Sequence, residues 1–380
     1  HPELARAREL GIPITRRAEA LGRAVADAKV VGIAGTHGKT TTTVMTTSAL
    51  AAAGLHPTGL AGGRVAEWKG NLHYESDELF VVEADEYDRS FLSLSPTIAV
   101  VTNIEADHLD IYRDLAEISS TFSRFVRGAV VIVLCADDRG ANGLEVPPSA
   151  EVIRYGIHSP DARLIASDIR SIGQSTNFVI SYDAKPLGGV ALRVPGRHNV
   201  RNALAAIGVG LALGVTLEAM RDGLLQFSGV ERRFQRLCDV AGVTIVDDYA
   251  HHPTEIEATL QAARESYPSR RIVAAFQPHL FSRTRDFAEA FGRALAKADS
   301  VFLAEIYPAR EKPMAGITSD LVAASLARAG RPATWQGTRA ELASALFDFV
   351  SEGDVVITIG AGDITRTGPE LRQRLEARGQ

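Results

Sequence analysis

Short, continuous apolar runs separated by helix-compatible segments recur along most of this 380-residue chain. A strand with one face in water alternates apolar and polar residues, whereas a continuous run is typical of a strand buried on both faces. The pattern therefore predicts an α/β fold with mostly parallel sheets. The runs lie at 30–34, 79–82, 97–101 and 129–134 in the first half, and at 243–246, 271–276, 300–303 and 354–358 in the second.

The same pattern divides the chain into three predicted parts. Residues 1–27 predict two helices, 2–10 and 16–28, around a short strand at 11–14, which is too little to bury a core. We interpret them as the end of an incomplete domain. Residues 28–228 form a central α/β domain, and residues 229–380 form a second one.

Residues 150–195 depart from this pattern because their short segments alternate. Alternation predicts a small antiparallel excursion from the otherwise parallel sheet. An Ala-rich helix through Leu213 follows, with Asn199 as its expected N-cap.

Composition excludes several classes of function. The net charge is −5 and no basic run occurs, which argues against nucleic acid as the main partner. The longest apolar stretches are too short to span a bilayer, so we expect no membrane insertion. Cys135 and Cys238 are the only cysteines, and both lie in apolar surroundings. They are expected to be buried free thiols, which fits a cytoplasmic protein.

A phosphate-binding loop is predicted between the first apolar run and the helix that follows it. Glycines let backbone N–H groups surround phosphate, a lysine reaches the β- and γ-phosphates, and a hydroxyl ligates Mg²⁺. Ile33 stands where the usual spacing has a glycine, so the loop is tighter than the common form. The residues concerned are Gly35, Thr36, His37, Gly38, Lys39, Thr40 and Thr41.

Two side chains that follow neighbouring runs are candidates for binding a divalent cation. Glu83 and His108 come after the runs at 79–82 and 97–101. Imidazole is an unusual ligand for Mg²⁺, so Mn²⁺ is an alternative. His108 as the cap of an acidic turn is the competing interpretation. For the acidic residues around them a solvated rim fits as well as a function: Asp85, Glu86, Asp107 and Asp110.

Three polar residues near the start of the Ala-rich helix are candidates for contacting adenine: His198, Asn199 and Asn202. For Asn199 a capping role is an equal alternative. Arg232 and Arg233, between the two α/β parts, either clamp phosphate or belong to a solvated linker.

The second α/β part offers polar turns for a second substrate. His251 and His252 are adjacent, and adjacent residues rarely ligate one ion. Arg283 is able to bind a carboxylate through two hydrogen bonds, although a solvated helix start also accounts for it. Together the residues indicate a nucleotide-driven enzyme.

The motifs together resemble the Mur ligase family from end to end. That resemblance implies a Rossmann-like UDP-binding domain, a P-loop-type central ATPase domain and a Rossmann-like C-terminal domain. This chain is expected to carry the last two, with the N-terminal Rossmann-like domain largely missing. The matching stretches are 35–42, 83–86, 102–108, 196–199, 232–234, 247–255 and 277–279.

Within the family the chain is most similar to the branch that joins L-alanine to UDP-N-acetylmuramate with ATP and Mg²⁺. The resemblance implies an acyl-phosphate intermediate and the first peptide step of peptidoglycan precursor synthesis. It assigns catalysis to Lys39, Glu83, His108, His251 and Arg283, and the metal to Thr40, Glu83 and His108. It places Arg233 and Asp248 toward the nucleotide, with Asn199 and His198 at adenine. It assigns the amino-acid pocket to Tyr249, His251, His279 and Arg283.

Two alternatives stay open. A murein-tripeptide ligase would share most of these motifs, although 277–285 and 360–363 favour the alanine-adding branch. An inactive ATP-binding fragment is the other. Leu280 departs from some alanine-adding relatives, which place arginine there. The oligomeric state, monomer or homodimer, is not predicted.

Overall fold

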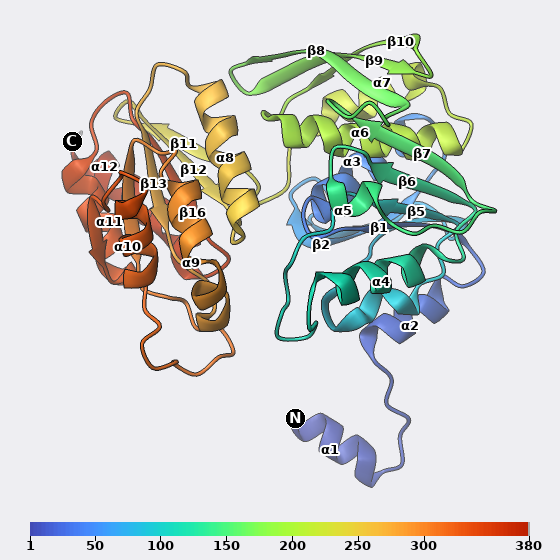
Figure 1. Ribbon diagram of the computed structural model, residues 1–380, viewed down its shortest axis with the longest axis horizontal. Helices are drawn as coiled ribbons and strands as arrows, with labels where there is room; N and C mark the ends of the chain where they lie inside the picture. The colour runs from blue at the N-terminus through green and yellow to red at the C-terminus, as the bar shows by residue number, and fades with distance from the viewer. Residues whose placement is uncertain (379–380) are drawn as a thin grey trace. The chain divides into compact units, whose positions relative to one another are not determined.

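The computed structural model describes residues 1–378 and contains two compact units (Figure 1). The last two residues of the predicted domain 229–380 lie outside this description. The first unit comprises His1–Asp168, Phe178–Ala191 and Val200–Phe227. The second comprises Ile169–Asn177, Leu192–Asn199 and the chain from Ser228 onward.

The first unit is built on a ten-stranded sheet with the order β10-β9-β8-β7-β6-β5-β1-β4-β2-β3. Neighbours from β2 to β8 run parallel, and β3 pairs antiparallel with β2. Two-residue turns join β8 to β9 and β9 to β10, which only antiparallel neighbours allow. The mostly parallel sheet and its antiparallel excursion are therefore confirmed. The strands are β1 (Lys29–Ala34), β2 (Thr58–Val65), β3 (Gly70–His73), β4 (Leu79–Glu83), β5 (Ile98–Val101), β6 (Val131–Cys135), β7 (Glu151–Gly156), β8 (Leu164–Ile172), β9 (Ser175–Tyr182) and β10 (Lys185–Leu192).

Helices cover both faces of this sheet, with α4 on one side and α6 on the other in Figure 1. Gly32 in β1 lies against Phe125 of α4, and Gly208 in α6 lies against Val133 of β6. No residue of α1 is buried. The helices are α1 (Pro2–Glu9), α2 (Arg17–Ala24), α3 (Lys39–Ala52), the 3₁₀ segment η1 (Tyr87–Ser93), α4 (Leu115–Val126), α5 (Arg139–Asn142), α6 (Arg197–Ala212) and α7 (Leu217–Gln226).

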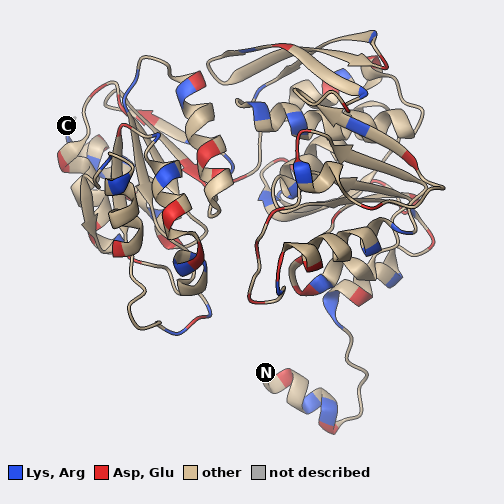
Figure 2. Cartoon of the chain, viewed as in Figure 1, with Lys and Arg blue, Asp and Glu red and all other residues tan. Residues whose placement is uncertain are grey.

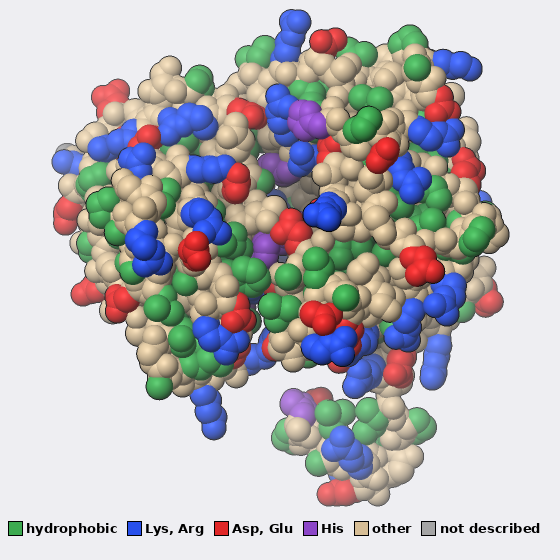
Figure 3. Space-filling view, viewed as in Figure 1, with side chains coloured by type: hydrophobic (Ala, Val, Ile, Leu, Met, Phe, Trp, Pro, Cys, Tyr) green, Lys and Arg blue, Asp and Glu red, His purple; other side chains and the backbone are tan. Residues whose placement is uncertain are grey.

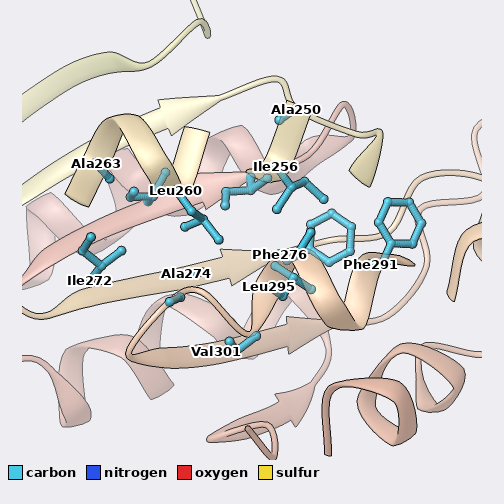
Figure 4. Close-up of a cluster of buried hydrophobic side chains, with 14 of the residues drawn as sticks. Ala250, Ile256, Leu260, Ala263, Ile272, Ala274, Phe276, Phe291, Leu295 and Val301 are labelled. Carbon is cyan, nitrogen blue, oxygen red and sulfur yellow. The ribbon is translucent and has the colours of Figure 1, made fainter. Parts of the chain in front are cut away.

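The second unit holds a six-stranded sheet with the order β11-β12-β16-β13-β14-β15. All neighbours run parallel except β11, which is antiparallel to β12. One core lies between α8, α9 and the sheet, where Ile256, Leu260, Phe276 and Phe291 interdigitate (Figure 4). The elements are β11 (Gln235–Val240), β12 (Val243–Asp248), α8 (Pro253–Ser266), β13 (Ile272–Phe276), α9 (Phe281–Leu295), β14 (Ser300–Ala304), α10 (Asp320–Arg328), β15 (Trp335–Gly337), α11 (Arg339–Phe349), β16 (Val355–Ile359), η2 (Asp363–Arg366) and α12 (Thr367–Arg378).

Three local predictions are wrong. Residues 11–14 are not a strand, and Ile12 and Ile14 remain exposed with no neighbouring strand beside them. Helix α6 begins at Arg197, so Asn199 lies inside its first turn and is not the N-cap. Cys135 is buried as expected, whereas Cys238 is only half-buried because it lies on the edge strand β11.

Surface properties agree with the composition. Positive and negative side chains are interspersed over both units (Figure 2), and on the face shown in Figure 3 hydrophobic side chains are scattered among charged ones. Within residues 1–378 no helix combines the length and apolar character needed to cross a membrane.

Helices α3 and α7 pack closely at Gly223, and this contact generates a stability prediction. A Cβ on Gly223 would lie 2.1 Å from the backbone oxygen of Ser48 and 2.8 Å from Cα of Ala49. Gly223→Ala therefore has to push the helices apart, and we expect the free energy of unfolding to fall by about 2 kcal/mol. Denaturant unfolding measures this loss.

Gly128→Ala is the matched control, because a Cβ there meets nothing within 4 Å. It should change the free energy of unfolding by less than about 0.5 kcal/mol. Equal stability of the two variants would contradict the close packing.

Candidate functional site

The loop between β1 and α3 requires glycine at two positions. Gly35 has φ +139° and Gly38 has φ +80°, both in the region that side chains rarely adopt. A Cβ on Gly35 would lie 2.0 Å from Oγ1 of Thr102, and one on Gly38 would lie 2.7 Å from Oδ1 of Asn202. The loop thus passes too close to its neighbours for any other residue.

Residues after β5 hold this loop in shape. The His37 N–H donates to Oδ1 of Asn103 at 2.7 Å, and Nδ2 of Asn103 donates back to the His37 carbonyl at 3.1 Å. Oγ1 of Thr102 donates to the same carbonyl at 2.6 Å, and the Thr36 N–H donates to the Asn103 carbonyl at 3.1 Å. The loop conformation is therefore fixed by side chains of the neighbouring strand end.

The Lys39 ammonium is enclosed by three oxygen atoms. It donates to the carbonyls of Gly35 at 2.7 Å and Thr36 at 3.3 Å, and to Oε2 of Glu86 at 2.8 Å. An ammonium has three N–H donors, so each has an acceptor. Burial would lower the pKa of Lys39, but the charges of Glu86 and Asp85 outweigh it and the pKa is raised.

Glu86 is the buried partner in this pair. Its side chain is 3 % exposed, and burial raises its pKa to about 7 despite the adjacent Lys39 charge. Glu86 is therefore not part of a solvated acidic rim, which was one of the two interpretations of this residue. Asp85 and Asp110 are exposed, whereas Asp107 is buried.

Thr40 and Glu83 meet at the start of α3. Oγ1 of Thr40 donates to Oε1 of Glu83 at 3.0 Å, and the Gly62 N–H donates to Oε2. Gly62 belongs to β2, and a Cβ there would lie 2.6 Å from Oε1 of Glu83. A hydroxyl and a carboxylate thus share one position at a helix N-terminus, a donor set that suits a hard divalent cation.

His108 lies near other carboxylates. Its Nε2 is 3.9 Å from Oε1 of Glu86 and 3.8 Å from Oδ2 of Asp107. Ligand atoms of Asp85, Glu86 and His108 all lie within 4.8 Å of one another. The structure therefore groups His108 with Glu86, while Glu83 lies with Thr40.

The predicted adenine residues are placed differently from one another. Asn202 lies against the phosphate loop, where its Oδ1 accepts from Oγ1 of Thr42 at 3.2 Å. Asn199 is buried, and its amide donates to the Pro195 carbonyl at 2.7 Å. His198 is half-buried in the same first turn of α6.

In the second unit, predicted residues gather at the carboxyl ends of β12, β13 and β14. The rings of Tyr249 and His251 are 5.3 Å apart, those of His251 and His279 are 6.2 Å apart, and His279 stacks on Tyr307 at 5.7 Å. The guanidinium of Arg233 lies over the Tyr249 ring at 5.2 Å. Parallel strands end at one edge, which is why turns distant in sequence meet there.

Arg283 is presented by the first turn of α9, and its residue is 7 % exposed. The residue before this helix, Leu280, has φ +71°, an unusual value for a side chain other than glycine. Its N–H donates to the Tyr307 carbonyl at 2.9 Å, and Glu311 accepts from the Ser282 N–H at 3.0 Å. The loop after β14 thus fixes where α9 begins.

Two family models match the chain: the Mur ligase middle domain over residues 33–210, and the Mur ligase glutamate ligase domain over residues 232–362. The chain belongs to the Mur ligase family. Both matched segments include the polar strand ends described above.

Similar proteins agree with this assignment. UDP-N-acetylmuramate–L-alanine ligase of Salinibacter ruber is 42% identical over 99% of this Mur ligase and 80% of its own length. The Bordetella pertussis protein of the same name is 44% identical over 97% of this chain and 82% of its own. The crystal structure of UDP-N-acetylmuramate-alanine ligase MurC from Thermotoga maritima superimposes with TM-score 0.83 at 29% identity, covering 99% of this chain and 83% of that one.

Sequence reasoning assigned no individual role to Asn103, which holds the phosphate loop, or to Gly62, which contacts Glu83, and it left the role of Glu86 open. Glu86 stood among several acidic residues, and nothing local distinguishes a buried carboxylate from a solvated one. Asn103 follows a predicted strand next to the loop strand, so its position was available as a signal. Gly62 was not detectable, because the glycine-rich strand β2 lacks an apolar run.

The approach of Gly62 to Glu83 generates a prediction for metal dependence. In Gly62→Ala the new Cβ displaces the flexible end of Glu83 from Thr40, with little cost in stability. We expect the Mg²⁺ concentration for half-maximal activity to rise about 10-fold, as for other residues that orient a metal ligand. Activity titrated against Mg²⁺ measures this shift.

Gly70→Ala in the paired strand β3 is the control, since its nearest contact is an ordinary 3.9 Å. An unchanged Mg²⁺ requirement in Gly62→Ala, with the control also unchanged, would show that Gly62 does not orient Glu83.

Asp248 generates a pH prediction. Burial raises its pKa from 3.8 to about 6, although Arg233 and the N–H groups of Ala250 and Phe234 oppose the shift. A higher pKa in the folded chain means that folding favours the protonated form. The stability from this group is present below pH 3.8 and is lost as pH rises through about 6.

The difference in free energy of unfolding between the native chain and Asp248→Asn should therefore fall by about 2.4 kcal/mol between pH 4 and pH 7. Denaturant unfolding at several pH values gives this difference. Asn cannot accept both N–H groups, which adds an offset that does not depend on pH. A difference that stayed constant with pH would contradict the raised pKa.

Proposed function

We propose that this Mur ligase is an ATP-dependent ligase that joins L-alanine to the carboxylate of UDP-N-acetylmuramate. The observation that carries the proposal is the similarity to proteins of that name, over 99% of this chain and 80% of the Salinibacter ruber relative, together with an intact phosphate loop around Lys39. The reaction is the first peptide step of peptidoglycan precursor synthesis, and its nucleotide substrates place it in the cytoplasm.

The chemistry explains why ATP is needed. A carboxylate is a poor electrophile, because attack by an amine would have to expel oxide. Transfer of the γ-phosphoryl group to a carboxylate oxygen gives an acyl phosphate and ADP. The amine of L-alanine then attacks the acyl carbon, and phosphate leaves from the tetrahedral intermediate with its C–O bond broken. The amine proton passes to a base.

In the first unit, the loop around Lys39 binds the polyphosphate. Backbone N–H groups at the start of α3 face the anion, and the helix N-terminus adds partial positive charge. Lys39 offsets the charge that gathers where the γ-phosphate meets the carboxylate. The solved MurF ligase from Thermotoga maritima in complex with ADP has the same fold, with TM-score 0.75 at 20% identity over 96% of this chain and 86% of that one.

Thr40 and Glu83 would hold one divalent cation, Mg²⁺ or Mn²⁺, and His108 would hold a second one. The donor set fits, because the Thr40 hydroxyl already points to a Glu83 oxygen and Glu86 has a buried oxygen beside His108. A bound divalent cation supplies positive charge to the phosphates.

In the second unit, Tyr249, His251, His279 and Arg283 would bind L-alanine. The rings from Tyr249 to His279 lie close to one another, and the guanidinium of Arg283 would bind the α-carboxylate through two hydrogen bonds. His251 would act as the base, and a role for Arg233 and Asp248 in nucleotide binding stays a prediction from the resemblance.

One competing function rests on the similarity to a murein peptide ligase from Psychrobacter arcticus. That structure superimposes with TM-score 0.68 at 21% identity, which shows a shared fold. Acceptor choice separates the two functions.

The deciding experiment measures phosphate release from MgATP and UDP-N-acetylmuramate with L-alanine, D-glutamate or the murein tripeptide offered in turn. The chain is assayed as it is and joined to the N-terminal part of a relative. Stimulation by L-alanine alone is expected. Stimulation by the tripeptide alone would move the assignment to the peptide ligase, and no stimulation in either form would favour a non-catalytic ATP-binding protein.

Arg283→Ala provides the prediction for the amino-acid site. Loss of a bidentate, charged contact should raise KM for L-alanine about 100-fold, while KM for ATP changes little. Steady-state kinetics with each substrate varied measures both values.

Arg285→Ala is the matched control, because Arg285 is exposed two residues along the same helix and pairs with Asp286. It should leave both KM values unchanged. An unaltered KM for L-alanine in Arg283→Ala would remove Arg283 from the pocket.

A further inference from the structure

Glu86 is fixed in place by the segments around it. It follows β4, and its backbone carbonyl accepts from the hydroxyl of Tyr112 at 2.5 Å. Tyr112 itself is 2 % exposed. The backbone of Glu86 is therefore anchored beside the phosphate loop, while its side chain keeps its own rotations.

The two carboxylate oxygens of Glu86 face different groups. Oε2 accepts from Lys39 at 2.8 Å. Oε1 is buried and has no hydrogen-bond partner among residues 1–378, and it lies 3.9 Å from Nε2 of His108. A buried carboxylate oxygen without a donor is costly, so this oxygen points to a position that a ligand would stabilise.

Lys39 cannot bind phosphate without giving up an acceptor. Its three N–H donors are occupied by Gly35, Thr36 and Glu86. The first two acceptors are carbonyls of the loop backbone, which Asn103 holds in shape. The third is an anionic side chain that repels an incoming polyphosphate. Glu86 is therefore the acceptor whose hydrogen bond to Lys39 breaks when phosphate binds.

We propose that Glu86 is an exchange residue for nucleotide binding. In the nucleotide-free protein it holds Lys39, and when ATP enters it releases Lys39 to the polyphosphate. Its carboxylate then acts with His108 on a divalent cation, so that cation binding becomes coupled to nucleotide binding. This inference rests on the proposed use of ATP.

The test is Glu86→Gln, which keeps the shape of the side chain and removes its charge. With EDTA present, metal-free ATP should bind the variant about 10-fold more tightly than the native chain, because Lys39 is no longer held by an anion. In the ADP complex, Mn²⁺ should bind about 10-fold more weakly, because a ligand is lost. Isothermal titration and electron paramagnetic resonance of Mn²⁺ give the two affinities.

The exchange predicts tighter binding of metal-free ATP and weaker binding of Mn²⁺ in Glu86→Gln. Damage to the fold would instead weaken both affinities. Asp88→Asn is the matched control, since it removes one charge from the adjacent segment, where Asp88 is exposed and pairs with Arg16. Both of its affinities should equal those of the native chain.

Lys39→Gln gives an independent arm if Glu86→Gln does not fold. Without the ammonium, Glu86 is available in the empty protein, and Mn²⁺ alone should bind about 10-fold more tightly than to the native chain. Unchanged Mn²⁺ binding in Lys39→Gln would overturn the exchange, as would unchanged or weaker metal-free ATP binding in a folded Glu86→Gln. Failure of the native chain to bind ATP at all would instead overturn the proposed function.

Discussion

A buried ammonium requires an acceptor for each of its N–H groups, and this requirement organises the first unit. The phosphate loop supplies two backbone carbonyls as acceptors, and Glu86, which follows β4, is the third acceptor. The loop that presents these carbonyls needs glycine at positions 35 and 38, where φ is positive. The order of strands, with β1 between β4 and β5, brings all these groups to one edge.

The second unit has the same architecture with different side chains at its strand ends. Its parallel strands also end in polar turns at one edge, but these turns carry rings and guanidinium groups in place of a glycine loop. His279 stacks on Tyr307, and the loop after β14 fixes the start of α9 and hence the position of Arg283. A planar aromatic surface with a nearby cation suits a small zwitterion better than a polyphosphate.

Sequence pattern predicted the elements whose burial is two-sided. The runs at 30–34 and 271–276 became β1 and β13 because a continuous apolar run has few other ways to be buried. It did not predict β2, where three glycines interrupt the apolar pattern; at one of them, Gly62, the side chain of Glu83 lies close to where a Cβ would be. It wrongly predicted a strand at 11–14, because a strand also needs a neighbour to accept its hydrogen bonds. Among the site residues, the loop could be predicted from its spacing. The position of Glu86 could not, because contacts distant in sequence contribute to it, such as the hydrogen bond from the Tyr112 hydroxyl to its backbone carbonyl, 26 residues away.

The two-way hydrogen bonding between Asn103 and His37 has a thermodynamic consequence. These bonds fix the backbone of the loop, so association with a nucleotide does not have to order it. Fixing the backbone of one residue costs roughly 1–2 kcal/mol in conformational entropy. In this loop the cost arises when the chain folds and not when a nucleotide binds. Nucleotide affinity is then governed by charge and desolvation, and it should respond to ionic strength more than to changes in loop flexibility.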